Sequence, residues 1–144
     1  MNPLLLNTEN QEFINDNLNS DLTALILKGT SIEGIETKEL IEQIESKKRS
    51  KNKLPTWFQH KNIYYPNKLN IEQTSSEITA EYKASFLTGS VIVDKTGGFG
   101  VDSFYFTKRF KSVIHCEIDA DLSQIVSHNF KQLEVENVQT IQTD

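Results

Sequence analysis

The sequence has few of the residues on which several classes of protein depend. It contains a single cysteine, Cys116, which rules out an internal disulfide framework and a zinc site built from clustered cysteines. Its apolar runs, such as those at residues 4–6 and 25–27, are far shorter than the ~20 residues that span a membrane. No basic segment precedes an apolar stretch at the N-terminus, as a secretory signal would require. We therefore expect a soluble, cytoplasmic protein with no membrane partner.

The charge balance is modest and acidic. The 144 residues carry 15 Lys and Arg against 20 Asp and Glu, a net charge of −5. A net negative charge argues against a protein whose whole surface binds nucleic acid, although it is compatible with a local basic patch. Hydrophobic residues form 37% of the chain, enough for one core of the size found in domains of about 100–150 residues. We expect one domain with a helical extension.

The first half of the chain has the apolar spacing of helices. Three segments repeat their apolar residues at helical intervals, and we expect helices near residues 9–18, 20–29 and 37–53. Pro55 ends this pattern, because proline disfavours helix in the residue before it. We expect an ordered, non-helical connector from Leu54 through an extended segment at residues 63–66.

Short polar motifs mark the expected helix ends. Thr8 with Gln11, and Thr74 with Glu77, have the spacing of a capping box, in which two side chains bind free backbone N–H groups at a helix start. Gly29 is well placed to end a helix in the left-handed conformation. These motifs predict helices that begin beside Thr8 and Thr74.

The pattern changes after residue 90. Three β-branched runs, at residues 91–93, 113–116 and 138–141, alternate with helical segments at 102–109 and 120–133. This alternation is typical of a parallel sheet with right-handed crossovers. The sequence therefore predicts an α/β protein. A helical N-terminal region at 1–72 precedes the first half of a Rossmann-like sheet, with three parallel strands, at 73–144.

A glycine-rich loop lies directly after the first of these strands and directly before a helix. The loop consists of Asp94, Lys95, Thr96, Gly97, Gly98, Phe99 and Gly100. Glycines at such a place allow a tight turn and a close approach to a ligand. Glu117 ends the second strand, where an acid can accept two hydrogen bonds from ribose hydroxyls, and Asp144 follows the third, where a side chain can meet a base edge. The pattern predicts a nucleoside-binding site.

Two kinds of nucleoside-binding enzyme are compatible with this loop. A dinucleotide-binding dehydrogenase uses G-x-G-x-x-G, but Gly98 and Gly100 are followed by Ser103, so the third glycine is missing. A methyltransferase that binds S-adenosylmethionine is favoured by Asp94, a carboxylate placed where a ligand with a cationic amine would sit. A third possibility is a non-catalytic module that binds a nucleoside or a protein partner.

Three segments give the chain a resemblance to a known family. Residues 94–103, 115–119 and 54–77 resemble class I S-adenosylmethionine-dependent methyltransferases that carry a C-terminal THUMP-like domain. The resemblance covers nearly the whole chain and implies S-adenosylmethionine as cofactor. It implies that Asp94, Thr96, Gly97, Gly98 and Gly100 surround the methionine end of this donor, that Glu117 binds the ribose, and that Asp144 lies near the adenine.

The same resemblance implies a substrate and a missing part. THUMP-like domains are associated with RNA, and related trimethylguanosine-synthase-like enzymes suggest a guanine exocyclic amine as methyl acceptor. Such enzymes have about seven strands, with a catalytic Asn/Asp-Pro-Pro-aromatic loop after the fourth. This chain stops after the third, so we expect it to be inactive alone and assign no catalytic residue. A second copy, the chain's own N-terminal segment or a missing C-terminal half is expected to cover the open edge of the first strand.

The remaining features are expected to be structural. The basic run at residues 47–53 suits phosphate contacts, but we interpret it as a solvated helix end. Trp57 and Phe58 are expected to pack against the helix that begins near Ser75. The three histidines lack the spacing of a metal site.

Overall fold

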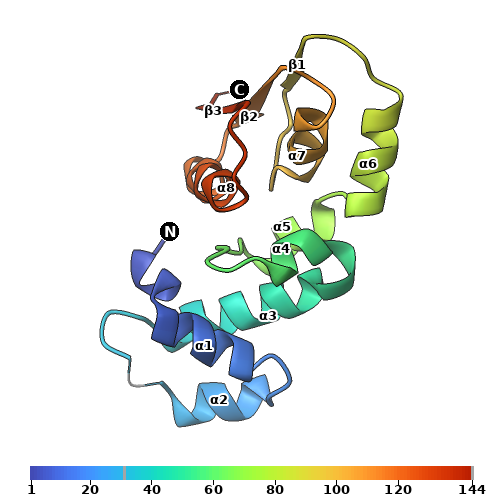
Figure 1. Ribbon diagram of the computed structural model, residues 1–144. Helices are drawn as coiled ribbons and strands as arrows, with labels where there is room; N and C mark the ends of the chain where they lie inside the picture. The colour runs from blue at the N-terminus through green and yellow to red at the C-terminus, as the bar shows by residue number, and fades with distance from the viewer. Residues whose placement is uncertain (31, 144) are drawn as a thin grey trace.

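The computed structural model describes residues 1–30 and 32–143 and consists of a helical layer beneath an α/β layer (Figure 1). The helical layer contains the 3-10 helix η1 (Pro3–Leu6) and the helices α1 (Thr8–Asp16), α2 (Leu22–Lys28), α3 (Thr37–Lys53), α4 (Pro55–Gln59) and α5 (Lys68–Gln73). The α/β layer contains α6 (Glu77–Ser85), β1 (Val91–Asp94), α7 (Val101–Thr107), β2 (Ser112–Glu117), α8 (Ala120–Gln132) and β3 (Val138–Gln142). No helix in the described ranges is long and apolar enough to cross a membrane.

The three strands form one parallel sheet in the order β1-β2-β3. Val113 and His115 of β2 are completely buried, whereas Val91 and Val93 of β1 are 59% and 48% exposed. Side chains alternate between the two faces of a strand. One face of the sheet is therefore packed, and the other is open along β1. The predicted α/β architecture is confirmed, with each strand boundary within one residue of the expected one.

Both predicted capping boxes are wrong. Asn7, not Thr8, occupies the N-cap position of α1, and the Gln11 side chain donates a hydrogen bond to the Leu5 carbonyl at 2.8 Å. The helix α6 is capped by Ser76, whose hydroxyl accepts from the Thr79 N–H at 3.1 Å. Gln11 thus binds the preceding 3-10 helix, six residues earlier, and Glu77 binds residues far away in the chain.

Glu77 connects three elements from its buried position. Its carboxylate accepts from the Thr56 N–H and hydroxyl, both at 2.7 Å, and from the Tyr105 hydroxyl at 2.9 Å. Leu54, at the N-cap of α4, has no polar side chain, so Glu77 supplies the cap from another helix. Burial and the adjacent Glu77 raise the pKa of Tyr105, which stays protonated and keeps its hydrogen bond.

The connector after Leu54 begins with helix, contrary to the prediction. Pro55 occupies the first position of α4, where its missing N–H costs nothing and its fixed φ suits a helix. A second short helix, α5, was not predicted. Asn67 caps its start, and the Lys53 ammonium binds the carbonyls of Ile71 and Glu72 at its end, at 2.9 and 2.8 Å. Residues 63–66 are free of helix and strand, as expected.

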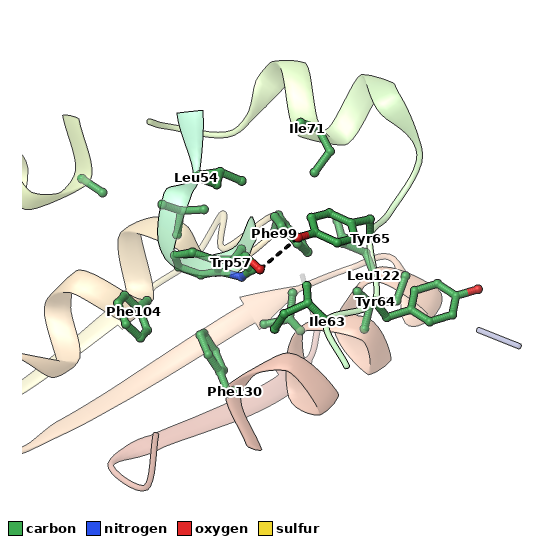
Figure 2. Close-up of a cluster of buried hydrophobic side chains, with 14 of the residues drawn as sticks. Leu54, Trp57, Ile63, Tyr64, Tyr65, Ile71, Phe99, Phe104, Leu122 and Phe130 are labelled. Carbon is green, nitrogen blue, oxygen red and sulfur yellow. Dashed lines mark hydrogen bonds between the residues drawn. The ribbon is translucent and has the colours of Figure 1, made fainter. Parts of the chain in front are cut away.

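Trp57 is at the centre of the core that joins the two layers (Figure 2). Its ring centroid lies 4.9 Å from that of Phe104 in α7 and 6.2 Å from that of Phe99 in the glycine loop. Trp57 is buried, as predicted, and its aromatic partners come from the loop and α7. Phe58 is half-buried and faces the side chain of Lys47.

We predict that Trp57→Ala lowers the free energy of unfolding by about 3–5 kcal/mol, because it removes a large, completely buried side chain. Chemical denaturation followed by circular dichroism measures this change. Leu27→Ala, at a leucine that is 83% exposed, is the control and should change stability by less than about 0.5 kcal/mol. A Trp57→Ala protein as stable as this control would contradict the shared core.

Candidate functional site

A cavity of about 450 Å³ lies at the carboxyl edge of the sheet. One wall consists of residues 96–99 of the glycine loop, and a second contains Glu117 and Asp119, which follow β2. Residues 73–75, from the connection between α5 and α6, form the opposite wall. Ligands of open α/β sheets bind outside the carboxyl ends of the strands. The cavity therefore occupies the place expected of a ligand site, and the helical layer contributes to it.

Glu117 is held by two backbone groups. One carboxylate oxygen accepts from the Gly98 N–H at 3.0 Å, and the other accepts from the Asp119 N–H at 2.9 Å. A carboxylate offers about four acceptor positions, so these two bonds leave others free. Glu117 is thus an oriented acceptor in the wall of the cavity.

Two glycines bring the loop against the sheet and α8. The Gly97 N–H donates to the Cys116 carbonyl at 2.9 Å, and a Cβ at Gly97 would lie 2.2 Å from Nε2 of His115. Gly100 has φ of 83°, and its Cβ would lie 2.8 Å from Cζ of Phe130. Only glycine fits at both places. The nearest atom to a Cβ at Gly98 is a backbone oxygen 3.9 Å away, so this residue leaves room beside the cavity.

Asp94 braces the loop from the end of β1. Its carboxylate accepts from the Thr96 N–H at 3.3 Å and from the Ser103 hydroxyl at 2.7 Å. Ser103 is completely buried and replaces the third glycine of a dinucleotide fingerprint with a hydrogen-bond donor. Lys95 is exposed. Asp144 lies outside the described residues.

Among the cavity residues that were not predicted as site residues, Asp102, Lys83 and Ser75 form one polar cluster. Asp102, in the first turn of α7, pairs with the Lys83 ammonium at 2.9 Å and accepts from the Ser75 hydroxyl at 3.0 Å. The other carboxylate oxygen of Asp102 is buried and has no hydrogen-bond partner among the described residues. Ser75 lies in a segment that carries the family resemblance, but no sequence pattern joins Lys83 to Asp102. Their pairing depends on how α6 packs on α7.

Comparison with known proteins identifies the fold. No protein-family model and no curated protein matches the chain. A crystal structure of a candidate methyltransferase from Porphyromonas gingivalis W83 matches 91% of the chain at 27% identity, with a TM-score of 0.75. The chain spans 33% of that protein's length.

Two further structures share less of the chain. An rRNA methylase from Streptococcus thermophilus matches 46% of this chain and 40% of its own at 24% identity, with a TM-score of 0.41. A candidate methyltransferase from Streptococcus mutans, in complex with SAH, matches 46% of this chain and 39% of its own at 24% identity, with a TM-score of 0.40. The P. gingivalis structure covers nearly the whole chain. This likeness shows that the chain has part of a methyltransferase fold, Rossmann-like and joined to a helical layer.

Proposed function

We propose that this chain is the S-adenosylmethionine-binding part of a methyltransferase. The observation that carries the proposal is Glu117, an oriented carboxylate in the wall of a cavity beside a glycine loop, within a fold shared with the P. gingivalis protein. A volume of about 450 Å³ is within the range of small-molecule sites. The free acceptor positions of Glu117 suit the two hydroxyl donors of a ribose.

Different residues of the chain are proposed to bind different parts of S-adenosylmethionine. Glu117 holds the ribose, while Thr96, Gly97 and Gly98 border the methionine end of the donor. Asp94 and Gly100 act on the loop itself, since Asp94 binds Thr96 and Gly100 packs against α8. Asp144 is proposed to lie near the adenine. When bound, S-adenosylmethionine supplies an electrophilic methyl group, and the task of these residues is to orient it.

We propose RNA as the methyl acceptor, with a guanine exocyclic amine as the reacting group. This part of the proposal depends on the family resemblance of the sequence, including its THUMP-like association, and we assign no catalytic residue. The P. gingivalis protein is about three times as long as the segment that this chain matches. We therefore propose that the residues that orient the acceptor belong to a further part of the enzyme.

The dinucleotide alternative is disfavoured by Ser103. Its buried hydroxyl donates to Asp94, so a serine is integral to this loop and a third glycine would remove a hydrogen bond. A non-catalytic module remains the second candidate, because β1 lies at the edge of the sheet and exposes Val91 and Val93, which suits a protein partner. Methyl transfer by the whole protein, with RNA as substrate, would exclude it.

We predict that Glu117→Ala weakens binding of S-adenosylhomocysteine by about 1.5–3 kcal/mol, or about 10- to 150-fold, because two charge-assisted hydrogen bonds are lost. Isothermal titration calorimetry on the full chain measures the affinity. Glu136→Ala removes an exposed carboxylate outside the cavity and should leave the affinity unchanged. Equal affinities for the two variants would remove Glu117 from the site, and an unmodified chain without affinity would contradict the proposed cofactor.

A second prediction concerns the open edge of β1 and the exposed face beside it, which we propose are covered by a C-terminal half of the enzyme. Alone, the 144-residue chain should associate through Val91 and Val93, which expose apolar surface. Val93→Lys should shift the chain toward monomer in light scattering, whereas Ile26→Lys, at an exposed residue of α2, should not. A strictly monomeric unmodified chain would contradict this proposal.

A further inference from the structure

Lys47 is buried in the middle of the longest helix. It belongs to the basic run at residues 47–53, which was expected to be a solvated helix end, yet only 5% of Lys47 is exposed. Two other cations of the run bind partners in the protein. Arg49 pairs with Glu45 and Glu72 at 3.1 and 2.6 Å, and Lys53 caps α5. The expectation of a solvated end is therefore wrong for Lys47, whereas Arg49 is paired but exposed and Lys53 is half-buried.

The Lys47 ammonium lacks an anionic partner among the described residues. None of the ion pairs and hydrogen bonds of these residues includes the Lys47 ammonium. Instead, Nζ lies over the rings of Phe58 and Tyr65, 5.8 and 5.9 Å from their centroids. Aromatic faces offset only part of the cost of burying a charge. Burial accordingly lowers the pKa of Lys47. Nζ of Lys47 is nevertheless not one of the completely buried polar atoms that lack a partner, so the ammonium keeps some contact with solvent. A cation that the protein leaves unpaired and accessible has the chemistry of a binding group.

A second cavity, of about 430 Å³, opens beside Lys47. Its walls are residues 59–62, at the end of α4 and just after it, and polar side chains of α1. It shares no lining residue with the cavity at the glycine loop. Lys61 and His60 add potential cationic donors, and Glu12 is the one carboxylate in the lining that the structure describes. Glu12 does not approach Lys47 within ion-pair distance. Donors therefore outnumber anionic acceptors in this cavity.

We propose that this cavity binds a phosphate group carried by a nucleotide or an RNA strand, with Lys47 as the buried cation that receives it. A phosphate oxygen would supply the negative charge that Lys47 lacks, and Lys61, an exposed residue of the same lining, can contact the same group. The half-buried ring of Phe58 lines the cavity and offers a surface on which a base can stack. A volume of about 430 Å³ accommodates a nucleotide. The site is independent of the proposed methyl-donor site.

The test is a titration of the ¹⁵N-labelled full chain, followed by NMR at constant ionic strength. Inorganic phosphate, guanosine monophosphate and a short unstructured RNA are the three probes. We expect saturable shifts in the backbone amides of residues 59–62 and none in those of residues 96–98 with inorganic phosphate. Lys47→Met should weaken binding at least tenfold. Lys51→Met, at an exposed lysine of the same helix, should change it less than twofold.

The three probes identify the source of the phosphate. Tighter binding of RNA than of the mononucleotide supports an RNA strand, and the reverse order supports a free nucleotide. Absence of saturable shifts at residues 59–62 with every probe would overturn the proposal, as would equal binding by Lys47→Met and the unmodified chain. If Lys47→Met does not fold, the chemical shift changes at residues 59–62 of the unmodified chain are sufficient to support or overturn the proposal.

Discussion

Two side-chain amides hold the extended segment at residues 63–66 between the layers of the molecule. Gln43 of α3 donates to the Tyr65 carbonyl at 2.6 Å and accepts from the Tyr65 N–H at 3.0 Å. Asn129 of α8 makes the same pair of bonds with Tyr64, both at 2.9 Å. Buried backbone groups need such partners, and this segment has no neighbouring strand to supply them. The position of the helical layer under the sheet depends on these four bonds.

The position of the glycine loop in the candidate site depends on contacts with this extended segment. The Tyr65 hydroxyl donates to the Trp57 carbonyl at 2.9 Å, and Trp57 in turn packs against Phe99 of the glycine loop (Figure 2). After residues 63–66 the chain forms α5, and residues 73–75 then line the cavity beside the glycine loop. The helical layer is thus a wall of the proposed donor site as well as a support for it. The boundary expected at residue 72 falls inside α5, beside a core that both layers share.

Local patterns in the sequence were sufficient for the sheet and for the loop. Strand runs, the glycines after β1 and the position of Glu117 follow from near neighbours in the chain, and they predicted the three parallel strands. Some failures were local, since Pro55 at the first position of α4 and the Asn67 cap of α5 are signals that near neighbours carry. Two others involve long-range partners. Glu77 has capping-box spacing but binds Thr56 and Tyr105, and Lys47 lies in a charged run but faces the core. The apolar periodicity of a sequence does not predict which helix or strand will pack against residues such as Glu77 and Lys47.

A crystal structure of the chain with S-adenosylhomocysteine tests the central claim most directly, namely that the donor site is built jointly by the glycine loop and the helical layer. The account predicts ribose hydroxyls within hydrogen-bond distance of the Glu117 carboxylate, with residues 73–75 in contact with the same ligand. A ligand bound away from Glu117, or one that touches the loop but leaves residues 73–75 free, would contradict it.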